Sequence, residues 1–144
     1  MKEKIAIVGM ACRFPRAHNI EAYWNLLVGG IEAVGDPPHN RRELEPPAWL
    51  VDQAPTSRRG GFLDELDCFE PGFFRISPRE AARLDPQQRL LLEVAWEALE
   101  DAGRPVTQLA GTSTGVFVGV MNADFARRRF SSAASSSASA AERL

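Results

Sequence analysis

The sequence predicts an α/β fold, in which buried strands pack against helices and a long irregular excursion interrupts the order. Short apolar runs rich in β-branched residues occur at positions 5–10 and 114–121, two strongly capped helix starts lie between them, and prolines crowd residues 34–61. The order is therefore strand, helix, excursion, helix, strand. Helices that separate apolar strands are typical of a sheet with parallel pairing.

The first run, residues 5–10, reads IAIVGM and is almost continuously apolar. Such a run suits a strand that is buried on both faces of a parallel sheet. It is too short for a signal-peptide core, and no stretch of the chain approaches the ~20 apolar residues that span a bilayer. We therefore expect a cytoplasmic protein with reduced thiols and no membrane partner.

The helix after this strand is predicted at residues 21–27. Asn19 is a favourable N-cap, because its side chain accepts a hydrogen bond from a backbone N–H of the first turn. Gly29 and Gly30 end the helix, because glycine accepts the left-handed conformation that closes it.

Residues 34–61 contain five prolines and end in two glycines. Proline removes backbone donors and interrupts regular structure, so we expect a long surface excursion here. Residues 62–74 are rich in aromatic side chains. They are expected to cover the core with irregular structure and short strands.

Two helix starts then follow in quick succession. Ser77 and Asp85 stand at cap positions, a proline follows each of them, and Glu80 or Gln88 stands three residues beyond the cap. This spacing is that of a capping box, in which the two side chains satisfy backbone donors that the first helical turn leaves unpaired.

The second of these helices is predicted to run to about Ala102, where Gly103 and Pro105 stop it. Its side chains fall into two stripes at helical spacing. We expect the helix to be buried on most of its circumference and solvent-exposed along one polar edge. The apolar stripe comprises Leu91, Val94, Ala95, Ala98 and Ala102, widened by Leu92, Trp96 and Leu99; the polar stripe comprises Arg89, Glu93, Glu97 and Asp101.

The last apolar run, residues 114–121, is the second strand candidate. After about Phe130 the chain is almost entirely serine and alanine. A segment with so little apolar area does not offset its ordering entropy. We therefore predict a domain at residues 1–130 and a disordered tail at residues 131–144.

Charge and motif content exclude several classes of protein. The formal net charge is −2, so no broad basic surface exists for nucleic acid. Neither of the two glycine-rich phosphate-binding patterns, GxGxxG after the first strand and GxxxxGK(S/T) anywhere, occurs in the sequence. Their absence argues against a nucleotide-binding protein. The one dense basic cluster is interpreted as solvated surface, with an acidic or phosphate-bearing partner as the alternative; it consists of Arg127, Arg128 and Arg129.

Residues with reactive side chains are scattered. A nucleophilic site needs a serine or cysteine beside a general base, yet His18 and His39 lie in loop-like stretches away from Cys12 and Cys68. We interpret Cys12 as a small buried residue after the strand and Cys68 as part of the aromatic packing. The two thiols lack CxxC spacing, so no zinc site is expected.

The remaining polar groups have simpler explanations than catalysis. The acidic group Asp64, Glu65, Asp67 and Glu70 lacks the spacing of a calcium loop and is interpreted as solvated. Helix capping accounts for Asp85, Gln87 and Gln88. No residue is therefore assigned as catalytic, cofactor-binding or metal-binding.

Four segments, read together, resemble a known family. They are KIAIVGMACRFP at residues 4–15, RRGGFLDELDCFEPGFFRISPREA at 58–81, RLDPQQRLLLEVAWEALEDAG at 83–103 and STGVFVGV at 113–120. Their order and spacing are similar to the amino-terminal part of ketosynthase domains of modular type I polyketide synthases. These domains are β-ketoacyl synthases of the thiolase-like fold, so the resemblance implies an incomplete first half of that fold.

The resemblance also implies a reaction and its partners. The family joins an acyl thioester held on a cysteine to a malonyl-type extender in a decarboxylative Claisen condensation. No cofactor is expected to bind directly, because substrates arrive on the phosphopantetheine of an acyl carrier protein. Neighbouring synthase domains and, in complete relatives, a homodimer are the other implied partners.

This chain departs from the family pattern at its reactive motifs. Motifs like DTACSSS, EAHGTGT and KSNIGH do not occur, and no nucleophile is transferred to the serines of the tail at Ser135, Ser136 or Ser137. We expect the chain alone to be inactive, and the alternative is a degenerate remnant used for docking or dimerisation. An engineered end, a frame change and a natural truncation all remain open.

Two smaller departures concern loops. Arg75 stands where glycine is commoner in the family, and Arg42-Glu43 stands where Arg-Trp-Asp is usual. We expect both to affect local loop shape only.

Overall fold

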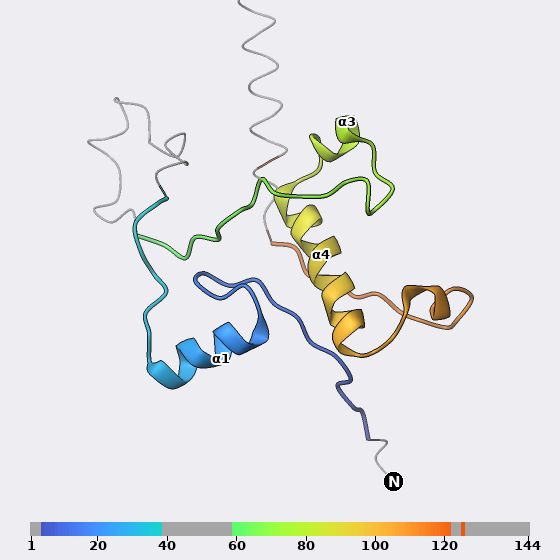
Figure 1. Ribbon diagram of the computed structural model, residues 1–144, viewed down its shortest axis with the longest axis horizontal. Helices are drawn as coiled ribbons and strands as arrows, with labels where there is room; N and C mark the ends of the chain where they lie inside the picture. The colour runs from blue at the N-terminus through green and yellow to red at the C-terminus, as the bar shows by residue number, and fades with distance from the viewer. Residues whose placement is uncertain (1–3, 39–58, 122–124, 126–144) are drawn as a thin grey trace, which may run out of the picture.

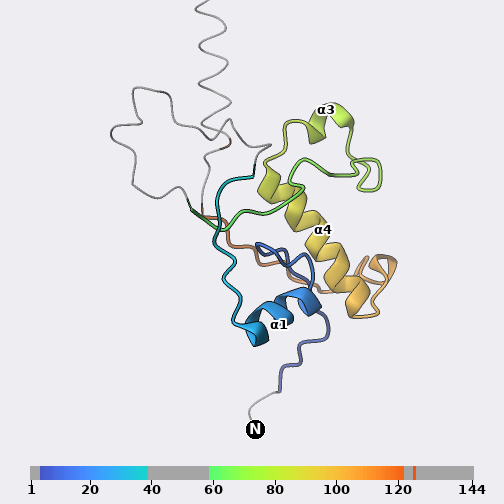
Figure 2. The same cartoon turned by 60° about the vertical axis from the view of Figure 1, so that its left-hand side comes forward.

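The computed structural model describes residues 4–38, 59–121 and 125. Within these ranges the chain forms helices α1 (Ile20–Gly29), α3 (Pro78–Ala81) and α4 (Pro86–Asp101) and a 3-10 helix, η2 (Val106–Gln108). Long irregular segments join them, and α3 lies near the N-terminal end of α4 in both views (Figure 1 and Figure 2). None of these helices is long and apolar enough to cross a membrane.

The predicted first helix is confirmed as α1. The side chain of Asn19 accepts a hydrogen bond from the Ala22 N–H at 2.8 Å, as expected of an N-cap. Gly30 closes the helix at a φ of +57°, in the left-handed region that glycine enters without a steric penalty.

The two capped helix starts are confirmed at α3 and α4. Ser77 Oγ accepts from the Glu80 N–H at 3.2 Å, although α3 continues for only 4 residues. Asp85 Oδ1 accepts from the Gln87 N–H at 2.9 Å, and Gln88 Oε1 accepts from the Asp85 N–H at 3.3 Å. The capping box of α4 is therefore complete.

The two strands predicted at residues 5–10 and 114–121 are not formed. In the part of the chain that the structure describes, the β pairing consists of two isolated bridges, Phe14 with Ala17 and Gly35 with Gly60. Both predicted strands are exposed, to 96% at Ile5 and 96% at Phe117, so the expected burial is wrong as well. A strand exists only through hydrogen bonds to a neighbour, and no described segment offers these two runs a ladder.

The predicted burial of α4 is also wrong. No residue of this helix is buried, and Leu91 and Leu92 of its apolar stripe are exposed. Glu93 and Glu97, on the edge that was expected to be wet, are instead half-buried. The reason is that the loop after residue 10 rests on this polar edge, as the contacts of Arg13 show.

The proline-rich excursion is described only at its two ends. Gly35 and Gly60 exchange backbone hydrogen bonds of 3.0 and 2.9 Å, which holds those ends together. Residues 39–58 lie outside the described ranges, and so do the basic cluster at residues 127–129 and the predicted tail at residues 131–144. The predictions for these three segments stay predictions.

Candidate functional site

Arg13 is the centre of the contacts between the N-terminal segment and α4. One guanidinium nitrogen donates to Glu97 Oε2 at 2.6 Å, and the other donates to Glu97 Oε1. The first nitrogen also donates to the backbone carbonyls of His18 at 2.7 Å and Cys12 at 3.2 Å. A bidentate ion pair between arginine and a carboxylate is strong and fixes the orientation of both groups. The hydrogen bond with Glu97 raises the pKa of Arg13, which keeps the guanidinium charged.

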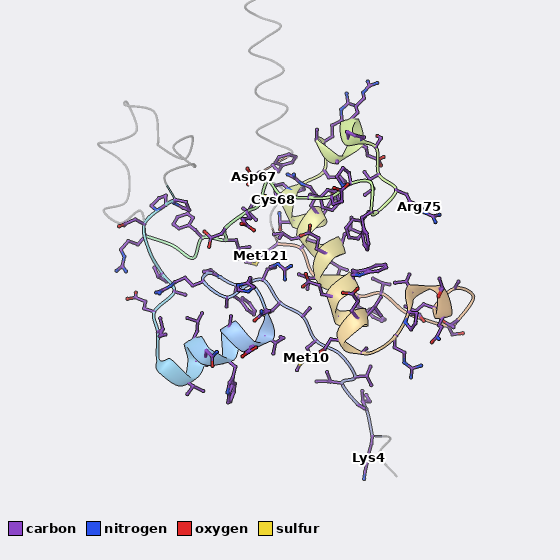
Figure 3. All side chains as sticks on the ribbon, viewed as in Figure 1. Lys4, Met10, Asp67, Cys68, Arg75 and Met121 are labelled. Atoms are coloured by element: carbon purple, nitrogen blue, oxygen red, sulfur yellow. The ribbon has the colours of Figure 1, made fainter. Side chains whose placement is uncertain are left out.

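A second anchor lies one helical turn further along the same edge. The Met10 N–H donates to Asp101 Oδ2 at 2.9 Å. Beside it, a Cβ added at Gly9 would lie 2.7 Å from Ala102 Cβ and would also collide with the Ala98 carbonyl oxygen. The backbone of residues 9–10 therefore rests directly on the C-terminal end of α4, at a distance that only glycine permits (Figure 3).

An open cavity of about 530 Å³ lies between the loop that carries Arg13, residues 63–74 and the polar edge of α4. One wall is aromatic: Phe73 meets Trp96 edge-to-face with ring centroids 4.6 Å apart, and Phe74 continues the group at 5.0 Å from Phe73. The lining also includes Glu93 of α4. Burial raises the pKa of Glu93, and the nearby Arg13 charge only partly opposes this effect.

The two thiols occupy different environments. Cys12 is 7% exposed, which confirms the prediction of a small buried residue. Burial raises the pKa of the Cys12 thiol, so the reactive thiolate is disfavoured. Cys68 is exposed and lines the cavity, so its assignment to the aromatic packing is wrong (Figure 3).

Among the described residues, no histidine is in place as a base for either thiol. His18 and Cys68 line the same cavity, which the sequence did not indicate. Across the described ranges, however, no hydrogen bond joins His18 to either cysteine. His39 lies outside those ranges. The described residues therefore do not assemble the nucleophile–base pair that acyl transfer needs.

The acidic loop and the start of α4 contain the other polar groups that were considered from the sequence. Asp64, Glu65, Asp67 and Glu70 are all exposed, in agreement with a solvated loop. Among the described residues, no group of three or more His, Cys, Asp or Glu side chains could hold a metal ion. Asp85, Gln87 and Gln88 are engaged at the start of α4.

Arg13 and Glu97 were not singled out from the sequence as partners. The available signal was the pair of carboxylates at Glu93 and Glu97, which lie one turn apart on one edge of a helix. An edge of this kind is usually solvated, so only the fold identifies Arg13 as its partner.

Comparison with known proteins identifies the family. Residues 2–143 match the model of the family described as "Beta-ketoacyl synthase, N-terminal domain". The chain belongs to this family, and more particularly it corresponds to an N-terminal fragment of a polyketide synthase ketosynthase domain. It is 46% identical to polyketide synthase PksM of Bacillus subtilis over 85% of its length, and 50% identical to the spectinabilin polyketide synthase system protein NorA' of Streptomyces orinoci over 88%.

Solved structures agree with this assignment. The ketosynthase from module 6 of the bacillaene synthase of Bacillus subtilis matches 83% of the chain with a TM-score of 0.71 and 38% identity. An oxazolomycin ketosynthase domain of Streptomyces albus matches 83% with a TM-score of 0.73 and 36% identity. The fold is thus consistent with part of a thiolase-like ketosynthase. The chain spans only 3% of each of the two curated relatives, and 20% and 22% of the two solved chains.

Proposed function

We propose that this chain provides the front scaffold of a ketosynthase domain and does not itself carry the groups that perform the condensation. The observation that carries the proposal is the state of its thiols. Cys12 is buried with a raised pKa, and Cys68 has no hydrogen bond to the one described histidine. The family's cysteine and histidine motifs are also missing from the 144 residues.

The complete domain that includes such a scaffold would catalyse a decarboxylative Claisen condensation. An acyl group first becomes a thioester on a cysteine. The malonyl-type extender then loses CO₂, and its carbanion attacks the thioester carbonyl and releases the cysteine thiolate. The extender and acyl groups would arrive on the phosphopantetheine of acyl carrier proteins. Neighbouring synthase domains, a second ketosynthase copy and a cytoplasmic setting belong to the same proposal.

Acylation of the isolated chain tests the proposal. The chain is incubated with an acyl-N-acetylcysteamine thioester and analysed by intact-mass and peptide mass spectrometry, with a complete ketosynthase as the positive control. We expect no stoichiometric adduct at Cys12 or Cys68 under conditions that load the complete enzyme. A thioester at either cysteine, lost on substitution of that cysteine by serine, would refute the scaffold assignment.

A further inference from the structure

The aromatic-walled cavity beside α4 has an excess of negative charge. Its volume of about 530 Å³ lies within the range of cavities that hold small organic molecules, roughly 300–1,000 Å³. Among the lining residues that the structure describes, carboxylates outnumber guanidinium groups by six to two. The carboxylates are those of Asp64, Glu65, Glu70, Glu93, Glu97 and Glu100. A cation is therefore attracted to this cavity, and an anion is repelled.

The two arginines of the lining already have partners. Arg13 binds Glu97 through both terminal nitrogens, and one of them also donates to two backbone carbonyls. Arg16 Nη1 donates to the backbone carbonyl of Glu32 at 3.0 Å. The pairing of Arg13 with Glu97 leaves five lining carboxylates against the single charge of Arg16. The arginines therefore do not remove the negative charge of the cavity.

Glu93 is the carboxylate best placed to hold a cation. Within the part of the chain that the structure describes, Glu93 forms neither a hydrogen bond nor an ion pair, and it is half-buried. Trp96 lies three residues further along α4, so the two side chains are neighbours on the helix surface. Phe73 meets Trp96 edge-to-face at 4.6 Å, and all three side chains line the cavity. A carboxylate beside aromatic rings attracts a cation through its charge and through the rings.

We propose that this cavity binds a small planar organic cation of the guanidinium or amidinium class, between the carboxylate of Glu93 and the aromatic side chains of Phe73 and Trp96. A planar cation of this class donates two parallel hydrogen bonds to one carboxylate. It is also weakly hydrated and stacks on aromatic rings, whereas a compact ammonium group is strongly hydrated and gains less from them. The inference goes beyond the scaffold role and does not depend on it, because it concerns a ligand of this chain alone.

Titration of the chain with benzamidine at neutral pH tests the cation site. Benzamidine carries an amidinium group on a phenyl ring, and benzamide is a neutral analogue of nearly the same shape. The indole N–H signal of Trp96 in heteronuclear NMR spectra, assigned by its loss in Trp96→Phe, reports occupancy of the cavity. We expect benzamidine to shift this signal in a saturable manner with a Kd on the order of 1 mM, as a ligand of so few atoms permits. Benzamide should bind roughly 10-fold more weakly, because it lacks the charge.

Two substitutions locate the site. Glu93→Gln removes the charge but keeps the shape of the side chain, and it should raise the Kd for benzamidine by about 5-fold or more. Glu21→Gln is the matched control, because Glu21 is exposed on α1 and does not line the cavity. The control should leave the Kd unchanged. Phe73→Leu keeps an apolar side chain but removes the ring, and it should raise the Kd by about 2- to 5-fold.

Several results would overturn the cation site. They are an equal affinity for benzamide, full affinity in Glu93→Gln, and an equal loss in Glu21→Gln. The absence of any shift of the Trp96 signal at concentrations roughly 10-fold above the expected Kd would overturn it as well. Circular dichroism of each variant shows whether its helices are intact. Glu93→Gln leaves the aromatic wall unchanged, so its result decides the proposal even where Phe73→Leu disturbs the packing on Trp96.

Discussion

α4 and the segment at residues 5–10 contrast in what holds each of them in place. The helix has a complete capping box at Asp85, and its backbone hydrogen bonds close within its own 16 residues. The N-terminal segment has strand-like composition, yet apart from the contacts of Gly9 and Met10 on α4 its side chains are open to solvent. Helical structure is local, whereas a strand depends on a partner that is distant in sequence.

The same contrast explains why the N-terminal loop lies where it does. Its attachment to α4 touches the end of the apolar stripe, where Gly9 lies against Ala98 and Ala102. Its hydrogen bonds to the helix use charged and backbone groups, through Arg13 with Glu97 and the Met10 N–H with Asp101. These directional hydrogen bonds fix the position of the N-terminal loop on α4 through a small contact area. Apolar side chains of both elements therefore stay exposed to solvent.

Gly9→Ala is expected to have the largest effect, because it attacks the contact between the two regions. The added Cβ would meet Ala102 and the Ala98 carbonyl, and such overpacking costs about 1–3 kcal/mol. Protection of the Met10 amide, which donates to Asp101, should fall by about 5- to 150-fold in hydrogen exchange, which is that free energy expressed as an equilibrium ratio. Gly119→Ala is the control, since a Cβ added at Gly119 finds open space. Equal loss in both variants would mean that the close approach at Gly9 is unimportant.

Arg75→Gly should instead stabilise the chain. Arg75 has a φ of +55°, and the left-handed region costs a residue with a side chain roughly 1–2 kcal/mol. Glycine avoids this cost but loses about 0.5–1 kcal/mol of unfolded-chain entropy, so the expected net gain is about 0.5–1 kcal/mol. The side chain of Arg75 points away from the helices, so little else is lost (Figure 3).

The matched control for this substitution is Arg79→Gly in α3, a right-handed helical position. There glycine should destabilise by up to about 1 kcal/mol. Urea unfolding followed by circular dichroism compares the two variants with the parent. A loss of stability in Arg75→Gly would contradict the strain assigned to the turn.

The sequence was enough to predict those structural features that depend on residues close together in the chain. The caps at Asn19, Ser77 and Asp85 and the closure at Gly30 were all predictable, because each depends on residues within one helical turn. The sequence also gave a sign of the backbone strain at Arg75, because this residue stands where glycine is commoner in the family. The apolar pattern gave wrong predictions where structure depends on segments that are distant in sequence. It predicted strands at residues 5–10 and 114–121 without showing which segments they would pair with.

The candidate site was harder to predict for the same reason. Glu93 and Glu97 looked like a solvated edge, and only the path of the chain after residue 10 brings Arg13 to them. Cys68 is exposed and lines the cavity, whereas Phe73, in the turns at residues 71–75, is the residue that packs against Trp96. Side-chain type identifies candidates, but the arrangement of loops decides which of them meet.

Glu93→Gln is expected to have the smallest effect and probes that edge of α4 directly. Burial raises the pKa of Glu93 above its ordinary value of 4.5, so the folded state holds this proton more tightly than the unfolded chain does. The stabilisation from the protonated carboxyl is present below the ordinary pKa and is lost as the pH rises through the folded-state value. At neutral pH the neutral glutamine should therefore be slightly more stable than the glutamate, by about 0.5 kcal/mol or less because the group is only partly buried.

This gain should shrink as the pH falls below the ordinary glutamate value, where the parent also carries a neutral side chain. Urea unfolding of parent and variant across that range measures the difference. Glu65→Gln, at an exposed position outside the helices, is the control and should show no comparable gain at neutral pH. A variant that is less stable than the parent at neutral pH would show that the attraction of Glu93 to Arg13 outweighs the burial of its charge. The polar edge would then hold the N-terminal loop through both carboxylates rather than through Glu97 alone.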